Sequence, residues 1–135
     1  MSTEYARPLP EPTLESAPYW EGLCQHTLLL QHCAACGKVR HYPRALCDAC
    51  YSTVCEWRAA SGDGAIHSWT IAHHPFHPGF KDAVPYPLVL VDLNDGVRLN
   101  APFRGAVSAL HVGLAVRLIF EDVTPTLTLP AFEVR

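Results

Sequence analysis

The second half of the chain alternates apolar and polar residues, which is typical of β-strands with one buried face. β-Branched and aromatic residues gather in five segments, and we expect strands over residues 65–73, 87–93, 97–103, 116–122 and 126–134. Asn94-Asp95-Gly96, between the second and third strands, is a strong signal for a hairpin turn. Five strands with one longer excursion predict a five-stranded OB-fold barrel, with an SH3-like barrel or a small sandwich as the structural alternative.

The first half of the chain carries shorter and more broken patterns. Residues 1–12 hold three prolines and no periodicity, so we expect an extended arm there. Ser16 and Pro18 mark the start of a helix, and Tyr19 and Trp20 give that helix an apolar side. Short apolar runs then predict three strands, over residues 27–32, 38–42 and 54–59.

Four cysteines in two tight pairs interrupt this first half. The pattern is C-x2-C-x10-C-x2-C, formed by Cys33, Cys36, Cys47 and Cys50. Two such pairs can aim four thiolates at one point, which suits tetrahedral Zn²⁺, and Gly37 lets the backbone curl behind the second thiolate. We favour a closed structural zinc site over two disulfides or four core cysteines. The fold class is therefore mainly β, with an arm and helix over residues 1–26, a zinc ribbon over 27–60 and an OB-fold domain over 61–135.

Composition restricts the classes of partner. The net charge is -3 and the pI is near 6.2, so nothing draws the chain to nucleic acid or an anionic membrane. Charged residues make up only 17% and apolar residues 49%, which favours a buried partner interface over a poorly soluble monomer. The first residues resemble no signal peptide and no apolar run has membrane-spanning length, so we expect a cytoplasmic protein.

Several side chains outside the cysteine pairs are candidates for metal binding, catalysis or phosphate binding. A loop with His73, His74 and His77 lacks a matching carboxylate or cysteine, so we interpret it as a plain loop rather than a second metal site. Cys24 and Cys55 show no base beside them, and no nucleophile, base and orienting group can be assembled. The ribbon's basic residues either hold a phosphate group or form a solvated face, and we favour the solvated face; they are Lys38, Arg40, Arg44 and Arg58.

The order of several short motifs carries a family resemblance. The aromatic-Trp-Glu-Gly helix precedes a C-x2-C-G pair, an aromatic-Pro-Arg triplet, a second C-x2-C pair and a strand beginning S-G-D-G. These motifs, with five that follow, are residues 19–22, 33–37, 42–44, 47–50, 61–70, 85–87, 95–99, 112–113, 116 and 129–132. The chain resembles, from about Pro8 to Arg135, the rubredoxin-like zinc-ribbon plus OB-fold family known as domain of unknown function 35. Tyr51 stands where the first pair has Gly37, a small departure.

The resemblance implies a small accessory protein that binds acyl-CoA or forms complexes with thiolase-like enzymes, including aldolases that cleave steroid side chains. The partner carries the chemistry, and Cys33, Cys36, Cys47 and Cys50 hold the metal. By this resemblance we expect a hetero-oligomer. The residues expected to bind a CoA thioester are Arg40, Arg44, Phe76, Phe80 and Lys81. The residues expected to contact the enzyme partner are Tyr19, Trp20, Phe76 and Phe80.

Two rival functions come from other classes. Zinc ribbons and OB barrels both bind single-stranded nucleic acid, but that function needs a basic groove. The barrel half offers only Lys81, Arg98, Arg104, Arg117 and Arg135. A free-standing CoA thioesterase or hydratase would need an acid–base pair that the sequence does not show.

Overall fold

The structure is a computed structural model and describes residues 5–135. It confirms a mainly β chain with one short helix. The elements are α1 (Ala17–Cys24), β1 (Leu28–Cys33), β2 (Val39–Arg40), β3 (Cys55–Ala60), β4 (Asp63–Ala72), β5 (Tyr86–Leu93), β6 (Arg98–Pro102), β7 (Ala115–Thr124), β8 (Leu127–Val134) and 3-10 turns at Pro78–Phe80 and Val107–Ala109. No helix of the described part is long and apolar enough to cross a membrane.

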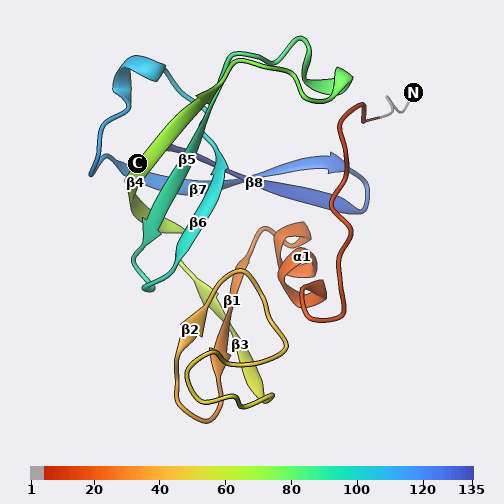
Figure 1. The fold of residues 1–135 in the computed structure, drawn as a ribbon, viewed down its shortest axis with the longest axis vertical. Helices are drawn as coiled ribbons and strands as arrows, with labels where there is room; N and C mark the ends of the chain where they lie inside the picture. The colour runs from red at the N-terminus through yellow and green to blue at the C-terminus, as the bar shows by residue number, and fades with distance from the viewer. Residues whose placement is uncertain (1–4) are drawn as a thin grey trace.

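The strands form two sheets (Figure 1). The ribbon sheet has the order β2-β1-β3, and the larger sheet has the order β6-β5-β4-β7-β8. The larger sheet curls until its outer strands meet: Phe103 and Phe132 form a parallel bridge, and the N–H of Arg104 donates to the carbonyl of Phe132 at 2.8 Å. This closure gives the OB-type barrel predicted from the strand pattern.

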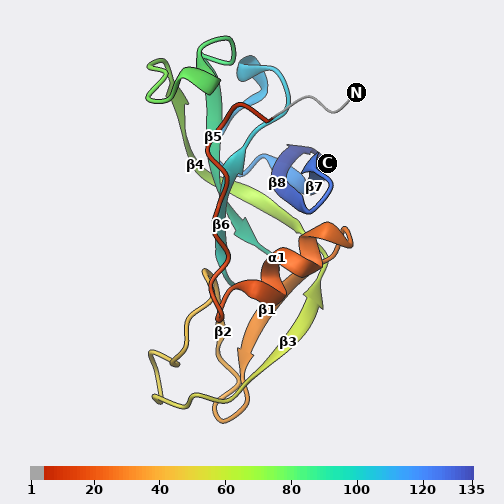
Figure 2. The same ribbon diagram turned by 90° about the vertical axis from the view of Figure 1, so that its right-hand side faces the viewer.

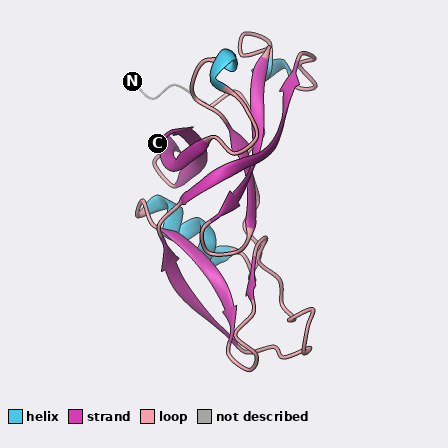
Figure 3. Ribbon diagram, turned by 90° about the vertical axis from the view of Figure 1, so that its left-hand side faces the viewer, coloured by secondary structure: helices cyan, strands magenta, loops and turns pink. Residues whose placement is uncertain are grey.

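The first barrel strand, β4, is bent by a register shift between Ile66 and Ser68. Such an irregularity increases local twist and lets one strand serve two neighbours. Consequently β4 pairs with β5 along its length but with β7 only through Asp63–Ala65. Its outer half extends with β5 away from the barrel, as the two long strands in Figure 3 show.

The core alternates along the strands as the sequence pattern predicted. In β5 the side chains of Val89, Val91 and Leu93 are buried, while the residues between them are more exposed. Phe103 and Phe132, both almost fully buried, fill the closed end of the barrel. One layer of alternating side chains therefore faces the barrel interior.

Helix α1 lies between the ribbon and the barrel (Figure 2). It contacts both β1 and β8, and its Tyr19 and Leu23 are buried. Leu28 and Leu30 of β1 belong to the same hydrophobic cluster as the barrel residues. The ribbon and the barrel thus share one continuous core.

Helix α1 begins without the side-chain cap that the sequence predicted at Ser16. Ser16 is the N-cap residue, but its hydroxyl does not cap the helix and is buried. The N–H and hydroxyl of Thr13 reach the Ser16 Oγ at 2.8 and 3.1 Å, so this hydroxyl closes a turn at the end of the arm. The Ser16 side chain therefore stabilises the turn that connects the arm to α1 and does not stabilise the first turn of the helix.

The arm is attached to the barrel at its other end. The Nε of Arg7 donates to the carbonyl of Gly79 at 3.2 Å, and its guanidinium lies 4.7 Å above the ring of Phe80. Because both contacts fall in the β4–β5 connection, the arm extends beside the barrel from α1 to this loop (Figure 2).

Gly62 provides a test of how tightly the barrel strands are packed. Its φ is +79°, and a Cβ there would lie 2.8 Å from the Cβ of Leu118. Gly96 also has a positive φ, +91°, but a Cβ there would meet open space. We predict that Gly62→Ala lowers the free energy of unfolding by about 2 kcal/mol more than Gly96→Ala, because both pay backbone strain and only Gly62 adds a clash. Equal losses in denaturant unfolding would contradict this packing.

Candidate functional site

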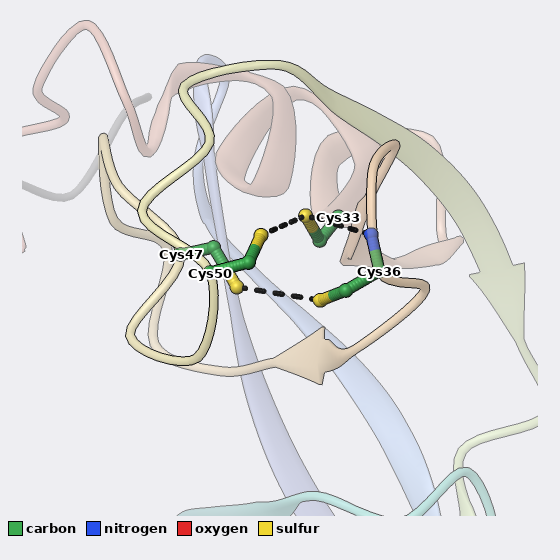
Figure 4. Close-up of side chains that lie close together, drawn as sticks. All are labelled: Cys33, Cys36, Cys47 and Cys50. Carbon is green, nitrogen blue, oxygen red and sulfur yellow. Dashed lines mark hydrogen bonds between the residues drawn. The ribbon is translucent and has the colours of Figure 1, made fainter.

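The four paired cysteines converge on one point between two loops of the ribbon (Figure 4). Their Sγ atoms all lie within 4.8 Å of one another. The Sγ of Cys33 is 3.5 Å from that of Cys50, and the Sγ of Cys36 is 3.7 Å from that of Cys47. Each loop therefore contributes one sulfur to each close contact, as a shared ion requires.

The two cysteine loops have the same backbone design. The N–H of Gly37 donates to the carbonyl of Cys33, and the N–H of Tyr51 donates to that of Cys47, both at 2.9 Å. Gly37 has φ +79° and Tyr51 has φ +65°. Tyr51 thus adopts the left-handed conformation that the first loop assigns to glycine, and the sequence departure at this position preserves the loop.

Backbone amides favour the thiolate form at Cys33 and Cys47, whereas the neighbouring cysteine sulfurs and burial raise the pKa of Cys50 to about 12. The N–H of Cys36 points at the Sγ of Cys33 at 3.5 Å, and this contact lowers the pKa of Cys33 to about 6. The backbone N–H of Cys50 likewise lowers the pKa of Cys47. Thiolate is the form that binds metal ions, so the donor set, its spacing and its amides fit a closed four-sulfur metal site.

The basic residues of the ribbon lie in different environments. Arg40 is buried, and its Nε donates to the Gln31 Oε1 at 2.7 Å. Lys38 pairs with Asp48 at 2.9 Å, and Arg58 pairs with Glu56 on β3 at 2.7 Å. The expected solvated basic face is therefore not continuous, because Arg40 lies inside the ribbon.

A cavity of about 330 Å³ opens where α1, the segment after β2 and the barrel meet. The indole N–H of Trp20 donates to the hydroxyl of Tyr42 at 3.1 Å across this cavity. Tyr19 is only 3% exposed, and its ring centroid lies 5.0 Å from those of both Trp20 and His41. Tyr19 was expected at the partner interface, and its burial places it in this chain's own core instead.

His41 is a half-buried titratable group of this cavity, beside the buried Tyr19. Burial lowers its pKa to about 4, because the charged imidazolium loses hydration there. His41 is therefore neutral near pH 7. It also lines a second cavity at the ribbon–barrel junction, so the two cavities share this residue.

The β4–β5 connection carries the apolar loop residues named from the sequence. Phe76 is 92% exposed, and Phe80 stacks on Tyr86 with ring centroids 5.6 Å apart. His77 accepts the N–H of Gly79 at 2.9 Å, and His74 lies edge-on against Phe76. Among residues 5–135 the histidines form no group of three or more placed to share a metal ion.

The expected CoA-binding residues fall in two separate places. Arg40 and Arg44 lie in the ribbon, whereas Phe76, Phe80 and Lys81 lie in the β4–β5 connection. The structure instead brings Arg98 of β6 into the same cavity as Arg40 and Arg44. Sequence reasoning missed Arg98 because its position depends on how the barrel packs on the ribbon.

The chain matches two family models that together cover most of it. One is the rubredoxin-like zinc ribbon domain of ChsH2, over residues 20–56, and the other is the C-terminal OB-fold domain of ChsH2, over residues 57–121. A solved structure titled Ltp2-ChsH2(DUF35) aldolase has a chain that is 36% identical, with a TM-score of 0.84, and the alignment covers 93% of this chain and 98% of that one.

Two curated relatives are longer proteins. The probable enoyl-CoA hydratase alpha subunit of Thermomonospora curvata is 38% identical over 127 residues. The 3-oxo-4,17-pregnadiene-20-carboxyl-CoA hydratase alpha subunit of Mycobacterium tuberculosis is 33% identical over 125 residues. The alignments cover 93% and 92% of this chain but 39% of each relative, so the chain spans about two fifths of their length.

The chain therefore belongs to the ChsH2-type DUF35 family, whose members join a rubredoxin-like zinc ribbon to an OB-fold domain. The family resemblance read from the sequence motifs is confirmed.

The cysteine cluster predicts a strong effect of metal loss. Cys47→Ser should abolish stoichiometric metal binding and lower the thermal unfolding midpoint, because three thiolates no longer close the tetrahedron. Elemental analysis and thermal unfolding of the same sample measure both. Cys24→Ser is the control, since Cys24 lies outside the cluster and should keep the metal. A fully loaded Cys47→Ser protein with unchanged melting would refute the site.

Histidine 41 predicts a pH effect. Its folded pKa of about 4 lies below the unfolded value near 6.5, so the unfolded chain binds more protons between these values. Stability should therefore fall as pH drops from about 6.5 to about 4, with a loss on the order of 2 kcal/mol at the acid end. His41→Gln should lose less over this window. The difference between the two proteins removes the contribution of metal release, which both share, and parallel curves would contradict the assignment.

Proposed function

We propose that the four-cysteine site holds one structural Zn²⁺. Thiolate–zinc bonds of about 2.3 Å place tetrahedral sulfurs about 3.8 Å apart. The close sulfur contacts of 3.5 and 3.7 Å support this ion size. Four protein sulfurs leave no open position, so the zinc would cross-link the two loops and would not activate a substrate.

We further propose that the chain is a non-catalytic subunit of a thiolase-type complex that processes acyl-CoA. The observation that carries this proposal is the 36% identity, over nearly the whole of both chains, with a chain of the Ltp2-ChsH2(DUF35) aldolase structure. Two relatives with hydratase alpha subunit in their names add support for a subunit that works beside another chain. A steroid-type acyl group is the finer form of the proposal.

The placement of titratable groups supports the non-catalytic part. The pairs His26–Asp122 and His67–Asp92 are at the surface, and each imidazole contacts its carboxylate at 3.0 or 3.1 Å. Of these four residues only Asp92 lines a junction cavity, and within the described part of the chain that cavity has no serine, threonine or cysteine in its lining. His41 packs against the ring of Tyr19. Catalysis would therefore come from the partner, with this chain stabilising the complex.

We place the partner against the β4–β5 connection. Phe76 is almost fully exposed, and the neighbouring Phe80 is held by Tyr86 on one side and by the arm residue Arg7 on the other. A protruding aromatic on a supported loop is a typical anchor for a protein interface. Trp20, in contrast, is partly buried against its own core and donates to Tyr42, so we expect it to act mainly on the stability of this chain.

The test uses the chain co-expressed with the thiolase-like enzyme of its native genome. We expect a stable hetero-oligomer in light scattering, acyl-CoA turnover by the complex and no turnover by this chain alone. Phe76→Ala should weaken association by about 2 kcal/mol, which is about thirtyfold in Kd. Leu14→Ala is a matched control, because Leu14 is 90% exposed but lies before α1. Turnover by the isolated chain, or the absence of any complex, would overturn the proposal.

A further inference from the structure

A second junction cavity, of about 410 Å³, lies between the ribbon and the β5–β6 hairpin of the barrel. Charged side chains dominate its lining, with four cations and two acids: Lys38, Arg40, Arg44, Arg98, Asp48 and Asp92. The remaining lining residues are small or apolar apart from His41, whose depressed pKa keeps it neutral. The cavity therefore carries an excess of positive charge in a chain whose net charge is negative.

Two of the four cations are already neutralised at the rim. Lys38 pairs with Asp48 at 2.9 Å, and the Nε of Arg98 donates to Asp92 at 2.7 Å. All four of these side chains are about half exposed. Ion pairs with that exposure are weak and exchange partners readily. Lys38 and Arg98 can therefore turn toward an anion at little cost.

The other two cations are outside the rim ion pairs, although Lys38 and, to a smaller extent, Arg44 lower the pKa of Asp48. Arg40 and Arg44 form no ion pair within the part of the chain that the structure describes. The guanidinium of Arg40 is held by neutral groups, with its Nε on the Gln31 Oε1 at 2.7 Å and its Nη2 on the carbonyl of Arg44 at 3.1 Å. A cation buried against neutral acceptors retains its field, and that field is weakly screened.

Arg40 also carries an unsatisfied donor. The residue is only 7% exposed, and its Nη1 is buried with no hydrogen-bond partner among residues 5–135. An unpaired buried donor on a charged group costs free energy, and a bound anion at this cavity would supply the missing acceptor. The two hydrogen bonds to Gln31 and Arg44 fix the guanidinium in place, so the positive charge at the base of the cavity is preorganised.

From these charges we infer that this cavity binds a phosphate-type oxyanion. Arg44, Lys38 and Arg98 supply the direct contacts, and Arg40 supplies a fixed charge beneath them. A phosphate monoester carries a charge near -2 at neutral pH, which matches the two unpaired cations. The inference deepens the proposed function and rests on it for the bearer of the phosphate, since CoA thioesters carry both a 3′-phosphate and a diphosphate.

The experiment titrates the isolated zinc-loaded chain at low salt with four probes: coenzyme A, dephospho-CoA, pyrophosphate and inorganic phosphate. Calorimetry measures affinity, and amide chemical shifts of Val39 and Val97, which line the cavity, locate the site. Weaker binding of dephospho-CoA assigns the 3′-phosphate, and equal binding of the two cofactors with competition by pyrophosphate assigns the diphosphate. Equal binding of inorganic phosphate assigns a free anion site. Each of these outcomes supports the inference.

The variants distinguish anion binding in this cavity from non-specific attraction of an anion to any surface arginine. Arg44→Gln and Arg98→Gln should each weaken anion binding about tenfold, which corresponds to one charge-assisted contact. Arg58→Gln is the matched control: Arg58 is an exposed ribbon arginine in an ion pair with Glu56, outside the cavity. Arg40→Gln is read only alongside its unfolding curve, because the residue is buried.

Three results would overturn the inference. They are the absence of shifts at Val39 and Val97 with every probe, affinities unchanged in Arg44→Gln and Arg98→Gln, or an equal loss in Arg58→Gln. Stronger binding of a diacidic peptide than of any phosphate would also overturn it and assign the cavity to a protein carboxylate. Complex formation with the enzyme partner is measured on the same variants and on the unsubstituted chain. Absence of anion binding by an unsubstituted chain that forms the complex would count against this inference alone, and absence of the complex would count against the proposed function.

Discussion

The meeting of four sulfurs at one point is the constraint on which the rest of the ribbon depends. The ribbon sheet is small, and β2 has only two residues. The segment between β2 and β3, residues 41–54, contains no helix or strand, and its large apolar side chains stay exposed: Tyr42, Leu46, Tyr51 and Val54. Such a segment cannot order itself by burial alone. Cys47 and Cys50 tie the middle of this segment to Cys33 and Cys36 in the first loop. The segment also supplies His41, Tyr42, Arg44 and Asp48 to the two junction cavities.

The two cavities that share His41 differ in character. One is rich in aromatic rings, and its Arg104 and Glu121 form a bidentate pair at 2.7 and 2.8 Å, with Arg7 as its one further charged residue among those that the structure describes. The other holds more cations than acids. The half-buried imidazole of His41 lines both cavities, and its surroundings lower its pKa to about 4. The junction therefore offers an aromatic surface and a cationic one that share a residue.

Much of the fold was predictable because it depends on local rules. The period-2 pattern of β5 gives its buried face directly, and Asn94-Asp95-Gly96 gives the turn that follows. The cysteine cluster was predictable for the same reason, since a C-x2-C loop brings its two sulfurs together whatever surrounds it. Tyr51 kept the second loop intact because its backbone adopts the required positive φ.

The rest depends on how the two modules pack, which local patterns do not encode. Tyr19 and Trp20 are neighbours on one helix, yet Tyr19 is in the core and Trp20 is at the edge of a cavity. Arg40 was expected in a solvated patch, but its place in the two-residue strand β2 directs it inward onto Gln31. Arg98 lies 58 positions beyond Arg40 in the chain, and only the docking of the β5–β6 hairpin on the ribbon brings them to one cavity.

Helix α1 has a consequence for how the molecule comes apart. Because it packs on β1 and on β8 at once, and because the residues it buries belong to one cluster, there is no surface along which ribbon and barrel can separate without exposing apolar side chains. The two domains that family models distinguish are therefore a single cooperative unit in thermodynamic terms. A chelator that opens the cysteine loops will loosen the barrel as well, and calorimetry will record one transition rather than two.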